Sequence, residues 1–232
     1  GQRLTGEIAV GEMTALVGRN GCGKSTLLRT LAGFLPPISG SVRWLGRELI
    51  EMQPRELSRL LSIVLTDRPD TGFLTVREIV ETGRIPYTNL TGHLTAKDRE
   101  VADKALCLTD TADFARRRLT SLSDGERQRV MIAKALAQQT PVILLDEPTA
   151  FLDYPGKIEM LELLTRLAHE EHKTILISTH DLELTFQTAD RLWLLGREGI
   201  QQGATREMLE SGVLEKELKY APRFVAAASA DQ

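Results

Sequence analysis

Apolar residues recur along this chain with two different spacings. Short, unbroken apolar runs are typical of strands that are covered on both faces of a sheet. They predict strands at residues 13–18, 41–46, 62–66, 141–147, 174–179 and 191–196. Apolar residues three or four positions apart are typical of helices that bury one face. They predict helices at residues 25–32, 75–82, 97–106, 124–139, 158–169, 181–188 and 206–218.

Strands that alternate with helices predict an α/β fold, in which a mostly parallel sheet has helices on both faces. Residues 67–139 interrupt this alternation, because they contain helical patterns and a loop at 87–94 but no buried strand. We therefore expect one domain. Residues 1–66 and 140–232 would form its α/β core, and residues 67–139 a helical subdomain inserted into that core.

Composition and charge narrow the class of protein further. Of the 232 residues, 42% are hydrophobic, which excludes disordered and fibrous classes. The 29 basic and 32 acidic residues give a net charge of −3, so no bulk positive field would attract nucleic acid or an anionic membrane. No apolar run approaches the roughly 20 residues that cross a bilayer, and no secretion signal is visible. Two cysteines are too few for a disulfide framework and indicate a reduced cytosol.

A glycine-rich segment joins the first predicted strand to the first predicted helix. It matches the pattern G-x-x-x-x-G-K-[ST] and consists of Gly18, Arg19, Asn20, Gly21, Cys22, Gly23, Lys24 and Ser25, followed by Thr26. Glycines let consecutive backbone N–H groups turn toward phosphate oxygens, and the following helix directs its positive end to the same point. Lys24 would neutralise the β- and γ-phosphates, and the hydroxyl of Ser25 would bind Mg²⁺. The segment therefore predicts a site for ATP and Mg²⁺.

Cys22, inside this segment, has two interpretations. Most cysteines in loops are small packing residues. A thiol beside a helix N-terminus and the ammonium of Lys24 can instead react readily with thiol reagents. The sequence alone leaves both interpretations open.

The strand predicted at 141–147 ends in two carboxylates, Asp146 and Glu147. Successive side chains of a strand point to opposite faces, so the two carboxylates can serve two roles. Asp146 would hold Mg²⁺, and Glu147 would act on the attacking water. His180 follows the strand predicted at 174–179 and is interpreted as a contact to the γ-phosphate, although a histidine in such a place is often only a surface or core residue.

The start of the helix predicted at 124–139 also has two interpretations. Ser123 and Glu126 form the S-x-x-E pattern of an ordinary capping box. A serine hydroxyl and free N–H groups at a helix start can equally form an anion site. Such a site could bind the γ-phosphate of a nucleotide that a second subunit holds.

The order and spacing of these motifs resemble those of ABC transporter ATP-binding subunits over essentially the whole chain. The resemblance rests on residues 18–25, 122–128, 146–147, 148–153 and on His180. It implies a P-loop NTPase (RecA-like) core with a mostly parallel sheet, an N-terminal antiparallel β part and an inserted α-helical subdomain. In this family the segment after the acidic pair is the D-loop, Glu147 corresponds to the catalytic base and His180 to the switch histidine.

The family resemblance also implies a head-to-tail homodimer around two Mg-ATP. The signature motif of one chain, usually LSGGQ, would face the P-loop of the other. In this chain the corresponding residues after Leu122 are Ser123, Asp124, Gly125 and Glu126.

The chain departs from the family pattern in three places. Asp124 stands where the family usually has Gly, and Glu126 where it usually has Gln, so two negative charges lie near a phosphate site and Arg127 offsets part of them. Thr66 occupies the position of the Q-loop glutamine, and its hydroxyl is expected to reach the metal or a water. The aromatic residue that stacks on adenine in this family is expected upstream of Gly1.

Residues 75–87 resemble the corresponding stretch of importer ATPases for iron–siderophore, haem and cobalamin complexes. The resemblance implies ATP hydrolysis coupled to import through a separate transmembrane permease, with a substrate-binding protein as an indirect partner. The protein would then lie peripherally at the cytoplasmic face of the inner membrane and dock through residues 67–139, with no nucleic acid as a partner.

Three other classes share parts of this pattern. DNA-repair and chromosome ATPases carry long coiled coils or zinc-binding cysteines between the motifs, and this chain has neither. A P-loop kinase needs an acceptor pocket rather than a signature motif. An ABC-type ATPase of an assembly scaffold, such as that of iron–sulfur cluster assembly, shares all the hydrolytic motifs and remains the alternative.

Overall fold

The computed structural model describes residues 4–66, 72–89, 92–196 and 199–218. Its strands are β1 (Met13–Gly18), β2 (Arg43–Trp44), β3 (Arg47–Glu48), β4 (Leu61–Val64), β5 (Val142–Asp146), β6 (Thr174–Ser178), β7 (Arg191–Gly196) and β8 (Gly199–Ala204). Its α-helices are α1 (Lys24–Leu31), α2 (Pro54–Leu60), α3 (Val76–Glu81), α4 (Ala96–Leu108), α5 (Asp124–Ala137), α6 (Tyr154–His169), α7 (Leu182–Thr188), α8 (Thr205–Glu210) and α9 (Val213–Leu218). Short 3₁₀ helices lie at η1 (Leu49–Glu51), η2 (Thr82–Tyr87), η3 (Ala112–Phe114) and η4 (Leu119–Ser121).

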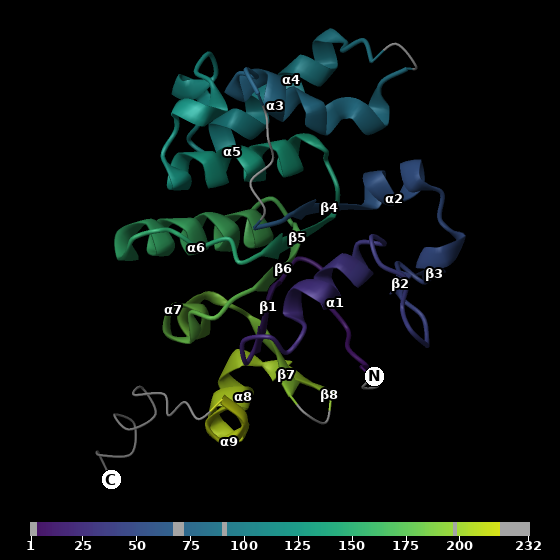
Figure 1. Ribbon diagram of the computed structural model, residues 1–232, viewed down its shortest axis with the longest axis vertical. Coiled ribbons are helices and arrows are strands. Elements are labelled where there is room, and N and C mark those ends of the chain that lie inside the picture. Colours follow the sequence, from purple (N-terminus) through teal and green to yellow (C-terminus); the bar gives the residue numbers. More distant parts are fainter. Residues whose placement is uncertain (1–3, 67–71, 90–91, 197–198, 219–232) are drawn as a thin grey trace.

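A six-stranded sheet in the order β4-β5-β6-β1-β7-β8 forms the centre of the molecule (Figure 1). All pairs in it are parallel except β7 with β8, and β2 and β3 form a separate antiparallel pair. The expected α/β fold with a mostly parallel sheet is confirmed. Because β4, β5, β6, β1 and β7 are parallel, their carboxyl ends meet at one edge of the sheet. Ligand sites of open α/β sheets lie at this edge.

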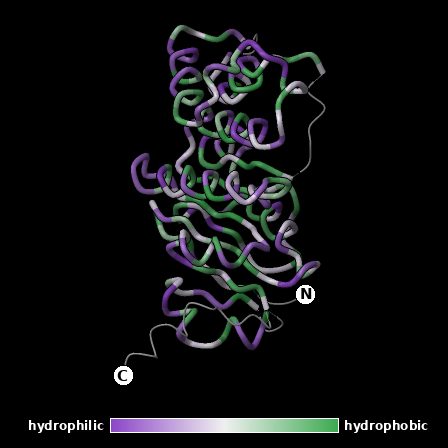
Figure 2. Tube along the Cα trace, turned by 90° about the vertical axis from the view of Figure 1, so that its left-hand side faces the viewer, coloured by the Kyte–Doolittle hydropathy of each residue, from purple (hydrophilic) through white to green (hydrophobic). Residues whose placement is uncertain are grey.

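Both faces of the sheet are buried, as the unbroken apolar runs predict. Along β1, Met13, Ala15 and Val17 pack into one hydrophobic cluster with residues of α5 and α6. Leu16 packs into the opposite cluster with Leu28 of α1 and other residues. Apolar segments concentrate in the strands and in the helix faces next to them (Figure 2). The core thus fixes the strand ends from both sides.

Most predicted elements are present, with shifted ends. The predicted strand at 41–46 is wrong in its extent, because β2 contains only Arg43–Trp44 before the chain turns back into β3. The predicted helix at 206–218 divides into α8 and α9, which Gly212 separates with a φ of 70°. The predicted loop at 87–94 is confirmed only in part, because Tyr87 belongs to η2 and residues 90–91 lie outside the described residues.

The pattern of apolar residues does not predict α2 or β8. Helix α2 is a short helix without a buried residue, so it leaves little apolar periodicity, although Gln53 and Glu56 form a capping box at its start and Pro54 occupies its first turn. Strand β8 has the sequence GIQQGA and pairs antiparallel at the sheet edge, where one exposed side allows polar residues.

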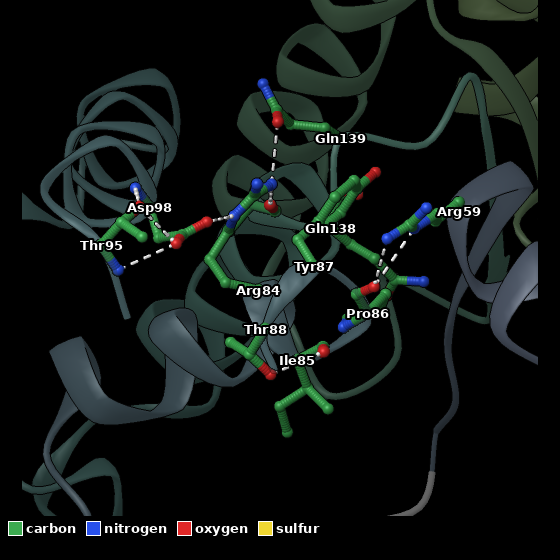
Figure 3. Close-up of polar contacts among 11 residues, drawn as sticks. Arg59, Arg84, Ile85, Pro86, Tyr87, Thr88, Thr95, Asp98, Gln138 and Gln139 are labelled. Carbon is green, nitrogen blue, oxygen red and sulfur yellow. Dashed lines mark hydrogen bonds and ion pairs between the residues drawn. The ribbon is translucent and has the colours of Figure 1, made fainter. Parts of the chain in front are cut away.

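Helices α3, α4 and α5 pack together into a helical lobe, which lies at the top of Figure 1. A buried ion pair inside it joins Arg84 Nε to Asp98 Oδ1 at 2.9 Å (Figure 3). Arg84 also donates through Nη1 to Ala137 O and to Gln139 Oε1, both at 2.8 Å, and its guanidinium stacks 4.0 Å from the ring centroid of Tyr87. Hydrogen bonds from the side chain and backbone of Thr95 are the main cause that lowers the pKa of Asp98 to about 2. The pair therefore stays charged and ties the start of α4 to the end of α5.

A set of polar contacts connects the helical lobe to the sheet. Arg59 of α2 donates twice to Pro86 O, at 3.1 and 3.0 Å (Figure 3). Gln138, just after α5, donates through Nε2 to Ser58 O at 2.6 Å and to Leu61 O at 3.0 Å. An added Cβ at Gly83 would lie only 2.4 Å from Lys134 O, so glycine is required for η2 to approach α5 so closely. The end of α5 is thus fixed against both the lobe and the core.

Candidate nucleotide site

The glycine-rich segment forms an open concave loop between β1 and α1. Gly21 and Gly23 have φ angles of 74° and 104°, which L side chains adopt with strain. A Cβ added at either would meet no atom within 4 Å, so the space in front of the loop is free. Helix α1 has no side-chain cap at its N-terminus, so its first N–H groups face this space with their hydrogens available. The loop therefore has the form that an anion such as a triphosphate requires.

Gly18 is needed for a different reason. A Cβ there would lie 2.8 Å from both Cys22 Sγ and Leu195 O, so glycine allows β1 to end tightly against β7 and the loop. Lys24 is buried, with 7% of its surface exposed, and its Nζ donates to Gly18 O at 3.0 Å. The ammonium of Lys24 thus bonds back to the start of the loop. When a nucleotide binds, phosphate oxygens would replace the Gly18 carbonyl as its acceptors.

The expected metal ligands Ser25 and Asp146 lie together. Ser25 Oγ donates to Asp146 Oδ1 at 3.0 Å, and Ser178 Oγ donates to the same oxygen at 2.6 Å. Asp146 is buried at the end of β5, directly opposite Ser178 in the sheet register. Ser178 is not among the predicted site residues, although its place at the end of the neighbouring parallel strand is a signal for it.

This arrangement fits Mg²⁺. Among the residues that the structure describes, no three His, Cys, Asp or Glu side chains gather as a metal site. Mg²⁺ needs no such group, since it typically takes one or two protein oxygens and completes its shell with phosphates and waters. The hard oxygens of Ser25 and Asp146 would hold it. Thr66 lies beside them, but its hydroxyl donates to Asp146 O at 2.8 Å, so it contacts the backbone of the metal ligand.

Glu147 and His180 form a close pair at the same edge of the sheet. His180 Nδ1 lies 2.6 Å from Glu147 Oε2, and the Glu147 backbone N–H donates to both Ser178 O and Ser178 Oγ. Glu147 has a φ of 51°, a left-handed conformation that costs about 1–3 kcal/mol in a non-glycine residue. Such strain is typical of functional sites, and here it turns the carboxylate away from the strand toward His180.

The signature region, residues 122–126, lies at the start of α5. Its capping box is present: Ser123 Oγ accepts from Glu126 N at 3.3 Å, and Glu126 Oε2 accepts from Ser123 N and Ser123 Oγ, both at 2.8 Å. These hydrogen bonds lower the pKa of Glu126, so its carboxylate stays ionised. The structural interpretation of S-x-x-E is thus correct, and Ser123 is half of the box rather than a free hydroxyl.

Two arginines lie beside the extra acids of this region. Arg127 Nη1 donates to Asp124 Oδ1 at 3.2 Å. Arg117 Nη1 lies 3.8 Å from Glu126 Oε1. The departures Asp124 and Glu126 are therefore each partnered by a cation, which offsets the repulsion that two bare carboxylates would exert on a phosphate.

Cys22 is exposed in the phosphate loop. We expect a thiol reagent to modify Cys22 and block nucleotide binding. Saturating ATP, at about ten times its Kd, should slow modification about tenfold, because bound phosphates cover the loop. Mass spectrometry of the modified peptides measures both rates.

Cys107 of α4 is the matched control, since it is also exposed and lies outside the loop. ATP should leave its rate unchanged. Equal modification of Cys22 with and without ATP would mean that this thiol is only a packing residue away from the ligand.

A second feature is an apolar groove between α5 and α2, with a volume of about 720 Å³. Met131, Lys134 and Gln138 lie on its α5 wall, while Met52, Leu57 and Ser58 lie on the other. Ile63 of β4 and Phe34 and Ile50 also line it. We call it the α5–α2 groove.

A parallel sheet with a glycine-rich loop before α1, and with Ser25 against Asp146, defines the class of P-loop nucleotide-binding proteins. Residues 2–150 match the model of the family described as ABC transporter. The chain belongs to this family, whose members use ATP hydrolysis to drive transport, and the expected family resemblance is confirmed.

Individual relatives refine the comparison. The chain is 41% identical to the uncharacterized ABC transporter ATP-binding protein MJ0873 of Methanocaldococcus jannaschii over 82% of this chain and 65% of that protein. It is 43% identical to the probable siderophore transport system ATP-binding protein YusV of Bacillus subtilis over 80% of this chain and 67% of that protein. The chain therefore spans about two thirds of the length of these relatives.

Two further relatives and a solved structure also belong to ABC transporters. The ferric enterobactin transport ATP-binding protein FepC of Escherichia coli is 39% identical over 93% of this chain and 80% of that protein. The cobalamin import ATP-binding protein BtuD of Halobacterium salinarum is 42% identical over 86% of this chain and 50% of that protein. The dimeric structure of the bacterial ABC transporter cassette MJ0796 superposes with a TM-score of 0.73 at 27% identity, over 88% of this chain and 89% of that one. In the described part of the chain, every helix is too short or too polar to span a membrane.

Proposed function

We propose that this chain is the ATP-hydrolysing subunit of an importer for an iron–siderophore, haem or cobalamin-type complex. The observation that carries the proposal is the meeting of four side chains at one sheet edge. Ser25 and Asp146 would hold Mg²⁺ beside the phosphate loop, and the pair of Glu147 and His180 would act on the attacking water and the γ-phosphate.

In the proposed reaction, each of these residues has one task. Lys24 and the α1 N-terminus bind the phosphates. Ser25 and Asp146 would hold Mg²⁺, which would supply positive charge against the charge that develops on those phosphates. Glu147 accepts a proton from the water that attacks the γ-phosphorus, and His180 orients this carboxylate through its 2.6 Å contact. Thr66, bonded to Asp146 O, positions the strand end.

A homodimer completes the proposed site. Two chains would close head to tail around two Mg-ATP, and residues Ser123, Asp124, Gly125 and Glu126 of one would contact the γ-phosphate bound by the other. Support comes from the dimeric cassette among the matching structures. It also comes from the exposed position of Ser123 at the start of a 14-residue helix.

Ser123→Arg tests the dimeric site. A bulky cation at the helix start should lower ATP turnover about 10²-fold, because the γ-phosphate loses its donors from the second chain. ATP binding to the single chain should stay unchanged, and equilibrium dialysis measures it. Ser121→Arg, two residues earlier on an equally exposed serine, is the control and should turn over normally. Loss of monomer binding in Ser123→Arg would instead mean that only the capping box matters.

The membrane partner would be a separate permease, with a substrate-binding protein acting on it from the other side. The transport and import functions in the names of the relatives support this class over a scaffold ATPase of iron–sulfur cluster assembly. The helical lobe, within residues 67–139, would dock on the permease and place the chain peripherally at the cytoplasmic face of the inner membrane.

Co-expression with a permease from the same genome tests the proposal. We expect a detergent-stable complex whose ATP turnover rises when its binding protein carries the chelate. Recovery of the chain only with assembly-scaffold proteins, and no complex with the permease, would contradict it.

A further inference from the structure

A buried serine at the end of β6 contacts both acidic residues of the candidate nucleotide site. Ser178 has no exposed surface, and it lies opposite Asp146 where β6 pairs with β5. Its Oγ donates to Asp146 Oδ1 at 2.6 Å and accepts from the Glu147 backbone N–H at 3.0 Å. One hydroxyl thus joins the expected metal ligand to the expected general base.

These two contacts fix the direction of the Ser178 hydroxyl. A serine hydroxyl has one hydrogen to donate, and the Glu147 N–H is itself a donor, so of these two neighbours only Asp146 can receive that hydrogen. A hydrogen bond to a carboxylate is about twice as strong as a neutral one. Because Ser178 is buried, water does not compete for this contact. The hydroxyl is therefore held in one orientation by the residues on either side of it.

The contacts of Asp146 distinguish its two carboxylate oxygens. Ser25 and Ser178 both donate to Oδ1, and no described residue donates to Oδ2, so Oδ2 is left for the metal. Ser25 is exposed at the start of α1 and is itself an expected metal ligand, whereas Ser178 is buried. Ser178 would therefore hold the carboxylate in place while the Ser25 hydroxyl turns toward Mg²⁺.

The same serine stabilises the turn at Glu147. This residue has a φ of 51°, and its N–H is shared between Ser178 O at 3.1 Å and Ser178 Oγ at 3.0 Å. A left-handed conformation persists in a non-glycine residue only where its surroundings hold it. The two oxygens of Ser178 hold the backbone in this turn, and the turn directs the Glu147 side chain to His180.

We propose that Ser178 is a positioning residue for ATP hydrolysis. Its hydroxyl orients the carboxylate of Asp146 for Mg²⁺ and stabilises the turn that directs Glu147 to the attacking water. The inference rests on the proposed function and adds a residue that acts through the two acids rather than on the nucleotide. Replacing a group that holds a metal ligand in place typically lowers metal affinity or activity about 10–100-fold.

Two variants of the same shape test the hydroxyl. Ser178→Thr keeps it, and Ser178→Val has a methyl group in its place, so the two variants differ in these hydrogen bonds alone. Equilibrium dialysis of a non-hydrolysable ATP analogue, with and without Mg²⁺, gives the factor by which the metal strengthens binding. This factor should be about tenfold smaller in Ser178→Val than in Ser178→Thr. Binding without Mg²⁺ should be equal in the two variants, because the Ser178 hydroxyl bonds to Asp146 and Glu147 rather than to the phosphate loop.

ATP turnover at saturating Mg-ATP is the second measurement. It should also be about tenfold lower in Ser178→Val than in Ser178→Thr, because the Glu147 N–H loses one of its two acceptors. Ser178→Ala adds no atoms to the core and should show the same losses relative to the parent chain. Ser62→Ala is the matched control. Ser62 is another buried strand serine, which accepts from Thr140 Oγ1 at 3.0 Å and lies opposite Ile143, so its loss should change neither measurement.

The outcomes separate this inference from the proposed function. Equal Mg²⁺ factors or equal turnover in Ser178→Thr and Ser178→Val would overturn the inference, and so would Ser178→Ala that matches the parent in both measurements. Equal losses in Ser62→Ala would overturn it as well, since any buried strand serine would then have the effect. Asp146→Asn should remove most of the affinity gained from Mg²⁺. If Asp146→Asn keeps that gain, Asp146 is not the metal ligand and the proposed function itself is contradicted.

Discussion

Replacing Glu147 with glutamine should lower ATP turnover by about 10²–10⁴-fold while leaving Mg-ATP binding intact. General-base catalysis contributes about this factor, and an amide cannot accept the proton of the attacking water. The amide keeps the shape of the side chain and can still contact His180, whose Nδ1 lies 2.6 Å from the carboxylate in the parent chain. Phosphate release at saturating ATP, together with equilibrium dialysis of the nucleotide, measures the two quantities.

Binding without hydrolysis should also have a visible consequence. Glu147→Gln should accumulate as a closed dimer in Mg-ATP, because the step that opens it is slow, and light scattering would detect the doubled mass. Glu162→Gln on the exposed face of α6 is the control and should hydrolyse ATP normally. Turnover of Glu147→Gln within about twofold of the parent would mean that this carboxylate is not the base.

The sequence predicts the strands whose ends form this site, and the reason is physical. Runs such as the one that precedes Asp146 are buried on both faces of a parallel sheet, so their hydrophobicity is continuous and their limits are sharp. Once the strands are parallel, their carboxyl ends must share an edge, and Ser25, Asp146, Glu147 and His180 must converge there. The parallel strand order alone brings these four residues to one edge, whatever the packing of their side chains.

The sequence does not predict the role of residues whose partners are distant in the sequence and meet them only in the folded chain. Ser178 sits in an apolar run as an ordinary strand residue until β6 pairs with β5 and brings it to Asp146. Arg84 follows the helix predicted at 75–82, and the residues around it in the sequence do not predict an ion pair. Its hydrogen-bond partners are 14 or more positions away in the sequence, and these separations carry no periodic signal. Strand β8 is likewise defined by the edge it pairs with rather than by its own composition.

The two interpretations of residues 122–126 show a further limit. A capping box and a phosphate-binding helix start use the same serine and the same N–H groups. The structure establishes the box, since Ser123 and Glu126 bond to each other in both directions. The capping box is compatible with phosphate binding, because a capped helix start is already rigid. The Ser123 hydroxyl could exchange its contact with Glu126 for one with a phosphate oxygen bound by a second chain.

Replacing Arg84 with methionine should lower the free energy of unfolding by about 3–5 kcal/mol, the cost of removing one partner of a buried ion pair. The size of the effect follows from Asp98. Hydrogen bonds from Thr95, rather than Arg84, are the main cause of its pKa of about 2, so Asp98 remains ionised and loses its buried counterion. The carbonyl of Ala137 at the end of α5 loses its donor as well. Urea unfolding at pH 7, followed by circular dichroism, measures the change.

The partner variants separate charge from packing. Arg84→Met combined with Asp98→Leu should recover part of the lost stability, because neither charge of the pair is then left without its counterion, whereas the capping hydrogen bonds between Thr95 and Asp98 are lost. Arg84→Lys should remain destabilised, since a lysine cannot reach Asp98, Ala137 O and Gln139 Oε1 together or stack as a plane on Tyr87. In the parent chain the pKa of Asp98 is lowered from 3.8 to about 2, so its stabilising contribution is complete above about pH 4 and decreases as the pH falls toward 2. A single variant Arg84→Met that unfolds at the same urea concentration as the parent would mean that the pair holds the end of α5 without stabilising the lobe.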